Sequence, residues 1–253
     1  MVAVPYSHPQ PIDKTAALRR IRHLLPGAAA LAANAGFLNT IALGFFQTPV
    51  SHMTGAVSHL GINAANGEWQ RTAASLGIIV GFVAGAAVAG MTVGPWKLIP
   101  GRTYGVALMM EGGLLATAAL MMFYSPLLSL PMVSMACGLQ NAMTSSYCGL
   151  AIRTTHVTGI VTDIGVMVGH WLRYRQIDRW KLRFLVTVFG FFGLGGFMGA
   201  MADSRFGTIS LAVPAFLCTV AGAIFWFIHH RGLVDLMQDA APQPPHTGSL
   251  GGK

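Results

Sequence analysis

Two long stretches of the chain, residues 24–67 and 112–152, contain no Asp, Glu, Lys or Arg. Each stretch is long enough for one to two membrane-crossing helices, since a crossing needs about 20 apolar residues. The composition agrees, because 53% of residues are apolar, only 9% are charged, and the mean hydropathy is +0.58. An ordinary soluble domain carries about 25% charged residues. The chain is therefore expected to be a membrane protein.

The net charge of +8 arises from basic residues that flank the apolar segments. One group lies within residues 14–22 and a second within residues 173–183. Basic clusters beside apolar segments are typical of the cytoplasmic ends of membrane helices. The expected partner is therefore the lipid bilayer, and no nucleic-acid partner is expected.

A phrase of eleven residues occurs twice within the apolar sequence. Residues 51–61 read SHMTGAVSHLG and residues 155–165 read THVTGIVTDIG, so five of the eleven positions are identical. A second echo precedes each copy, GFLN at 36–39 and GLQN at 138–141. Polar residues are costly where the surroundings are lipid, so these must face protein or water. The repetition predicts a duplicated membrane protein whose polar patches mark its functional site.

Eight apolar segments are expected, four in each repeat. Repeat one covers about residues 24–124 and repeat two about residues 126–229, within a membrane domain at 23–231. Residues 1–22 are expected to form a cytoplasmic basic tail, and residues 232–253 a disordered tail. The expected segments are 24–46, 52–66, 72–92, 104–124, 127–151, 155–170, 184–202 and 207–228.

Two topologies remain open for this all-α helix bundle. If all eight segments cross the membrane, both termini lie inside, together with twelve of the sixteen Lys and Arg residues. If the two motif segments, 52–66 and 155–170, instead dip in and return, six helices cross. Fourteen basic residues then lie inside, with only Arg71 and Arg205 outside. The positive-inside rule favours six crossings, an arrangement of inverted repeats that occurs in transporters.

Each motif segment carries a polar stripe if it is read as a helix. Residues seven apart share a face, but they are separated by about 10 Å along the axis. One helix therefore cannot chelate an ion with them, and neither a metal nor a cofactor is expected. A shared site would need His52 to approach His156, or His59 to approach Asp163; otherwise the stripes serve helix packing. The stripes are His52, His59 and Asn66, and His156, Asp163 and His170.

The Thr-Gly pairs, Thr54-Gly55 and Thr158-Gly159, are expected to be the pivots of the motif segments. Glycine permits a helix break or a close crossing, and threonine can satisfy a backbone group that the break frees.

Four further side chains are candidates because they are polar within apolar segments. Asn39 and Asn141 precede the two motifs and suit bracing of the motif segment or contact with a polar solute. Glu111 and Asp163 are the two acids within apolar segments, and such acids often bind a proton or a cation. Asp163 is favoured over Glu111 because it belongs to a repeated stripe.

The two motif phrases also carry a family likeness. GFLN followed by HMTG, and GLQN followed by THVTG, resemble the YoaK-like family of bacterial membrane proteins, the domain-of-unknown-function family 1275. The likeness covers about residues 24–230, and the chain departs from the family pattern at Asn39 and Ala56. The resemblance implies a polytopic protein of the bacterial inner membrane and implies no activity.

The leading hypothesis is a small-solute secondary transporter or channel-like protein with its site between the Thr-Gly segments. A small solute, a proton or a cation is the expected ligand. The alternative is a non-transporting scaffold or assembly protein whose polar repeats serve packing. No HExxH, GxSxG or P-loop motif occurs in the chain, so we expect no catalytic residues and no enzyme; an intramembrane enzyme is the third and weakest option.

Overall fold

The computed structural model describes residues 14–93, 102–145 and 155–230. Within these ranges the chain is all-α, as the sequence predicts, and it contains no strand. The elements are α1 (Lys14–Phe46), α2 (Met53–Ala65), α3 (Trp69–Val93), α4 (Arg102–Tyr124), α5 (Pro126–Ser145), α6 (Val157–Tyr174), α7 (Arg179–Phe206), a 3-10 turn η1 (Gly207–Leu211) and α8 (Ala212–His230). Residues 1–13 of the predicted N-terminal tail and all of the predicted tail at 232–253 lie outside the described residues, whereas residues 14–22 of the first tail belong to α1.

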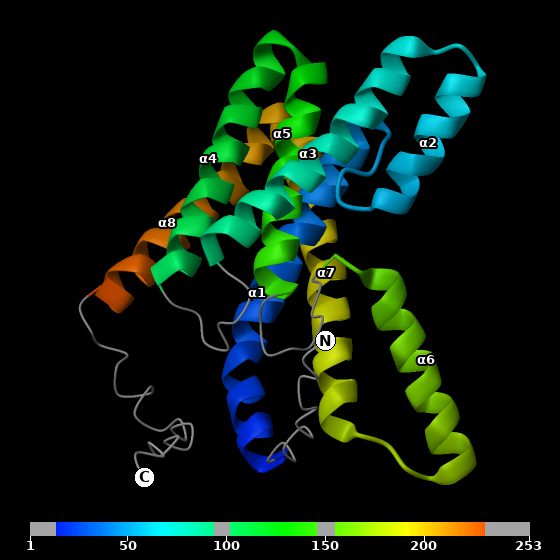
Figure 1. Ribbon diagram of the computed structural model, residues 1–253, viewed down its shortest axis with the longest axis vertical. Helices are drawn as coiled ribbons and strands as arrows, with labels where there is room; N and C mark the ends of the chain where they lie inside the picture. Colours follow the sequence, from blue (N-terminus) through cyan, green and yellow to red (C-terminus); the bar gives the residue numbers. More distant parts are fainter. Residues whose placement is uncertain (1–13, 94–101, 146–154, 231–253) are drawn as a thin grey trace, which may run out of the picture.

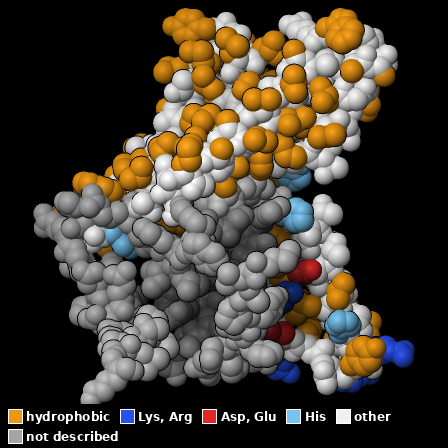
Figure 2. Space-filling view, in the orientation of Figure 1, with side chains coloured by type: hydrophobic (Ala, Val, Ile, Leu, Met, Phe, Trp, Pro, Cys, Tyr) orange, Lys and Arg blue, Asp and Glu red, His pale blue; other side chains and the backbone are white. Residues whose placement is uncertain are grey.

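Several of these helices are long and apolar enough to cross a membrane, in agreement with the expected class of protein. Among the described residues the qualifying stretches are Leu25–Phe46, Trp69–Val93, Thr103–Tyr124 and Arg179–His229. The last stretch holds α7, η1 and α8. Hydrophobic side chains cover much of the described surface in Figure 2, as expected for helices whose outer faces meet lipid.

The long helices pack in three pairs, α1 with α7, α3 with α5, and α4 with α8 (Figure 1). Glycines allow the backbones to approach closely, as in other membrane helix pairs. Ala33 lies against Gly195 and Phe37 against Gly199, so α1 and α7 run parallel. Two helices are parallel when residue numbers rise together along their contacts. This holds for α3 and α5, where Gly81 lies against Pro131 and Gly85 against Met135. It is reversed in α4 and α8, which are antiparallel, because Gly105 lies against Gly222 and Gly112 against Ala215.

The two short helices that carry the motif phrases lie at the edge of this bundle. α2 packs on α3, and α6 packs on α7 (Figure 1). α2 buries Ala56 and Asn63, and α6 buries Ile160 and Met167. Most other side chains of α6 are exposed. The motif helices are therefore held mainly by one neighbour each.

Helix α7 begins at Arg179, earlier than the expected start at residue 184. The Asp178 carboxylate is the reason, because it accepts hydrogen bonds from the backbone N–H groups of Trp180 (3.1 Å) and Lys181 (3.0 Å). A side chain that satisfies the first free N–H groups of a helix fixes where the helix starts. α1 also begins before residue 24, since residues 14–23 are rich in good helix formers.

Candidate functional site

The connection between α1 and α2, residues 47–52, runs into the centre of the bundle. Val50 is fully buried, and its carbonyl accepts a hydrogen bond from the Ser134 hydroxyl of α5 (3.1 Å). The same hydroxyl lies 2.7 Å from the Ile78 carbonyl of α3. One serine therefore ties the connection to two of the long helices.

Asn39 braces this connection from α1. Its Oδ1 accepts a hydrogen bond from the Ser51 hydroxyl (2.8 Å), and the Ser51 oxygen also lies 2.8 Å from Nδ1 of His52. Ser51 is buried. The asparagine that precedes the first motif thus fixes the residues that lead into α2.

The second motif has the corresponding contact, with donor and acceptor exchanged. Asn141 of α5 donates from Nδ2 to the hydroxyl of Thr155, and Asn141 and Thr155 are both buried. Thr155 stands where Ser51 stands in the first phrase, and Asn141 stands where Asn39 stands. Both predicted asparagines therefore hold the residues just before a motif helix.

The Thr-Gly pairs lie in the first turn of each motif helix, after the break rather than at it. A Cβ added to Gly55 would come 2.6 Å from the Pro49 side chain, and one added to Gly159 would overlap the ring of His156. Glycine is needed here because the preceding segment folds back over the first turn. Thr54 and Thr158 are exposed, so their hydroxyls stay available.

His52 and His156 are the N-cap residues of α2 and α6, and neither side chain caps its own helix. His156 is one of the charged or titratable groups that act electrostatically on His52. Burial lowers the pKa of His52, and the nearby His156 lowers it further. The His52 ring also lies 6.0 Å from the ring of Phe192 in α7, between centroids. His156 is exposed.

The remaining members of the stripes lie away from this pair. Asp163 forms an ion pair with Lys181 of α7 (3.1 Å), and both side chains are about half exposed (50% and 52%). His170 stacks edge-on against Tyr174 on its own helix. Of the two pairs that the sequence left open, His52 and His156 are the one with an electrostatic interaction between its members.

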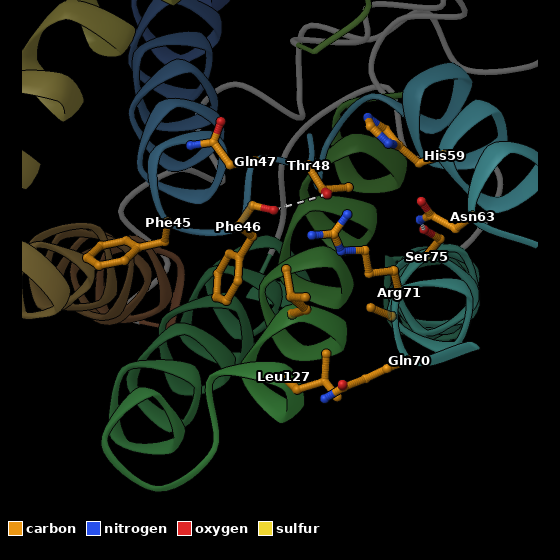
Figure 3. A pocket seen from close by; sticks show the side chains of 12 residues that line it. Phe45, Phe46, Gln47, Thr48, His59, Asn63, Gln70, Arg71, Ser75 and Leu127 are labelled. Atoms are coloured by element: carbon orange, nitrogen blue, oxygen red, sulfur yellow. Dashed lines mark hydrogen bonds between the residues drawn. The ribbon is translucent and has the colours of Figure 1, made fainter. Parts of the chain in front are cut away.

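His59 lines a cavity of about 450 Å³ between α2, α3 and the ends of α1 and α5 (Figure 3). Arg71 and Ser75 of α3 line it, and the Asn63 amide donates to the Ser75 hydroxyl (3.4 Å). The lining of this cavity does not include Thr54, His156 or Asp163.

Glu111 is fully buried in α4. Its Oε1 accepts a hydrogen bond from Nδ2 of Asn34 in α1 (3.0 Å), and Asn34 also donates to Oε1 of Gln140 in α5 (2.9 Å). Glu111 was a candidate from the sequence, whereas Asn34 and Gln140 were not. Asn34 and Gln140 carried the same signal, a polar side chain inside an apolar helix. No group of three His, Cys, Asp or Glu side chains in the described part of the chain could hold a metal ion.

The model of the family described as "Protein of unknown function (DUF1275)" matches residues 27–224. The chain belongs to this family, which confirms the resemblance carried by the two motif phrases. No curated protein and no solved structure matches the chain.

Proposed function

We propose that this member of the DUF1275 family is a membrane transporter or channel-like protein for a small polar solute. Its site lies where α2 and α6 begin, between the two Thr-Gly phrases. The observation that carries the proposal is that His52 and His156, equivalent residues of the two phrases, each stand at the N-cap of a short helix and interact electrostatically with one another.

The packing contacts support two inverted repeats. A shift of 102 residues takes Gly36 to Gly138, and a shift of 110 takes Phe82 to Phe192; Gly36 lies against Phe192, and Gly138 lies against Phe82. The same shifts convert the contact of Ala33 with Gly195 into that of Met135 with Gly85. In each case the residue from repeat one maps onto repeat two and the residue from repeat two maps onto repeat one. A contact that maps onto another contact in this way is what a twofold axis between the repeats produces.

The antiparallel pair α4 and α8 follows the same rule. Shifting Gly112 by 110 residues gives Gly222, and the same shift takes Gly105 to Ala215. Gly112 lies against Ala215, and Gly222 against Gly105. A chance resemblance of two phrases would leave no such relation in helices that lack the phrase.

The helix directions support the model with six crossings. α1, α4 and α7 run one way and α3, α5 and α8 the other, so the first half is the second half inverted. The basic turn between α6 and α7 then lies on the side where α1 begins, while Arg71 and Arg205 lie on the opposite side. With the positive-inside rule, both termini are cytoplasmic, and we assign the chain to the bacterial inner membrane.

The chemistry of the site favours a neutral or anionic solute. His52 and His156 stand at the N-termini of α2 and α6, the positive ends of two helix dipoles, and half-helix N-termini bind anionic substrate groups in other transporters. The neighbouring groups are hydroxyls and imidazoles, and Asp163 is engaged by Lys181 instead. A metal cation would meet like charge there, and we propose no catalytic role for these residues.

A non-transporting scaffold is the second candidate. The buried pairs of Asn39 with Ser51 and of Asn141 with Thr155 favour it, since they are satisfied internally. The exposed side chains of Thr54, His156 and Thr158 favour transport, because packing residues would be covered.

The test is a binding screen on the purified full-length chain, read as the thermal unfolding temperature. A ligand that binds only the folded state raises this temperature. The probes are small carboxylates, small neutral hydroxyl compounds and monovalent metal cations. We expect a carboxylate or a hydroxyl compound to stabilise the wild type, and the stabilisation to be lost in His52→Gln and in His156→Gln. His170→Gln is the matched control and should respond like the wild type.

Equal stabilisation of the wild type and both site variants would remove the histidines from the site. Each stabilising solute is then tested in proteoliposomes. If vesicles that contain the chain pass it no faster than lipid vesicles do, the transport proposal fails and the scaffold stands.

A further inference from the structure

The buried carboxyl group of Glu111 has one satisfied oxygen and one that is not. Oε1 accepts from the Asn34 amide (3.0 Å), whereas Oε2 is buried without a nitrogen or oxygen partner, and the other group that reaches the carboxyl is the Cys218 thiol, a weak donor. The side chain has no exposed surface. A buried ionised carboxylate normally engages several donors, so this geometry suits a carboxylic acid better than a carboxylate.

The surroundings of Glu111 are polar but uncharged. Four helices contribute: Asn34 from α1, Glu111 itself from α4, Cys137 and Gln140 from α5, and Cys218 from α8. The two thiols are the titratable groups that face it, and the Cys218 thiol reaches the carboxyl. Among the residues that the structure describes, no Lys, Arg or His pairs with Glu111. An ionised Glu111 would lack a counter-charge, which is the costly way to bury an acid.

The donors of the cluster favour a proton over a metal cation. The Asn34 amide directs its N–H groups at the oxygens of Glu111 and Gln140 (3.0 and 2.9 Å), and the Gln140 amide donates to the Leu31 carbonyl (2.8 Å). A cation needs several oxygens that converge on one point, and here N–H groups occupy that position. A proton on Oε2 neutralises the charge and needs no further ligand.

The Glu111 cluster is unlike the motif site because it occurs once. Under the shifts of 102 and 110 residues, Asn34 corresponds to Ala136 and Gln140 to Leu38. In the same way Glu111 corresponds to Ala221 and Cys218 to Leu108. The twofold-equivalent place is therefore filled by apolar residues from both repeats, so the packing that the repeats share does not need the polar groups.

We propose that Glu111 is a proton-binding site in the interior of the bundle, with the exchangeable proton on Oε2. Binding converts the carboxylate to the acid: the solvent hydronium ion gives its proton to Oε2 and leaves as water, and no other reactant is involved. The proposal does not depend on transport. Its link to the motif site is α5, where Gln140 of the cluster is followed directly by Asn141, which holds Thr155.

The test is infrared spectroscopy of the purified full-length chain, because a protonated carboxyl has a C=O stretch that a carboxylate lacks. We expect this band in the wild type at neutral pH, its loss at alkaline pH, and its absence from Glu111→Gln. Asp163→Asn is the matched control, since it removes a half-exposed, ion-paired acid, and it should keep the band. A wild type without the band at neutral pH, or an unchanged band in Glu111→Gln, overturns the proposal.

A second variant covers the case in which Glu111→Gln does not fold. Asn34→Ala keeps the acid and removes its amide donor, so the band should persist and move to higher frequency, as a less hydrogen-bonded C=O does. An unmoved band would show that it belongs to another acid and would overturn the assignment. Sodium chloride titrations complete the test: stabilisation of the wild type but not of Glu111→Gln by sodium would make this a cation site instead.

Discussion

Gly112 and Gly113 are neighbours in α4, yet a methyl group added to each would meet different surroundings. A Cβ on Gly112 would overlap the Thr219 hydroxyl, which can rotate away, and would come 2.8 Å from both the Ala215 carbonyl oxygen and the Thr219 backbone nitrogen of α8, which cannot. A Cβ on Gly113 would have no atom within 4 Å. We therefore expect Gly112→Ala to destabilise the protein and Gly113→Ala to leave it unchanged or slightly more stable.

The size of the difference follows from the distances. Ordinary contact begins near 3.4 Å, so α4 and α8 must separate by about 0.6 Å to admit the methyl group. A gap of that order forfeits roughly a quarter to a half of each dispersion contact beside it, and overpacking of this kind costs about 1–3 kcal/mol. The helix-propensity gain of Gly→Ala, about 1 kcal/mol in water, applies to both variants and cancels. Gly112→Ala should thus be less stable than Gly113→Ala by about 1–3 kcal/mol.

The assay is reversible unfolding of the purified variants in detergent, from which the free energies of unfolding are compared. Gly222→Ala is the third variant, because its Cβ would come 2.7 Å from the Gly105 carbonyl across the same interface. It should match Gly112→Ala, and the double variant should cost less than the sum, since one separation of the helices serves both. Equal stability of Gly112→Ala and Gly113→Ala would refute the reasoning.

Three further predictions concern the α7 cap, the topology and the central serine. Asp178→Ala should cost about 1 kcal/mol of unfolding free energy through loss of the N-cap, whereas Asp163→Asn, which breaks a half-exposed ion pair, should cost less than about 1 kcal/mol; equal losses would contradict the cap. In a chain without its native cysteines, Asn66→Cys should react with a membrane-impermeant thiol reagent added outside, and Gln176→Cys should react only after the membrane is permeabilised. The model with eight crossings instead requires that neither cysteine reacts with the reagent from outside. Ser134→Ala should lower the unfolding free energy by about 1–3 kcal/mol, because it leaves buried carbonyls without their donor, and an unchanged value would count against the anchored connection.

The helical class and the motif helices could be predicted from sequence because both depend on local signals. Long uncharged runs allow little besides membrane helices, and the two phrases carry their own glycines and hydroxyls. Bracing by Asn39 and Asn141, one of the two roles that the sequence left open, agrees with their contacts, and each lies near its partner along the chain. Apolar content alone places the start of α7 at residue 184, because the polar first turn of this helix is stabilised by the Asp178 cap and not by apolar burial.

The Glu111 cluster could not be predicted, because it depends on which helices become neighbours. Asn34 and Glu111 are 77 residues apart, and Asn34 and Gln140 are 106 apart. The pattern of polar residues along one helix does not reveal which residues of other helices will be its hydrogen-bond partners. Asp163 illustrates the same limit, since its equivalence to His59 favoured a place at the repeat interface, whereas its neighbour is Lys181 of the next helix.

The two motif helices are equivalent in sequence but not in packing, and this difference bears on mechanism. α2 is joined to α3 by the Asn63–Ser75 hydrogen bond beside a cavity, whereas α6 is joined to α7 through the half-exposed pair of Asp163 and Lys181. Inverted repeats that take unlike conformations can exchange them, because each half has a sequence able to adopt the partner's arrangement. If the proposed repeat relation holds, the exchange would separate α2 from α3 and pack α6 more closely on α7, while His52 and His156 stay in place. Access to the same two histidines would then pass from one side of the membrane to the other.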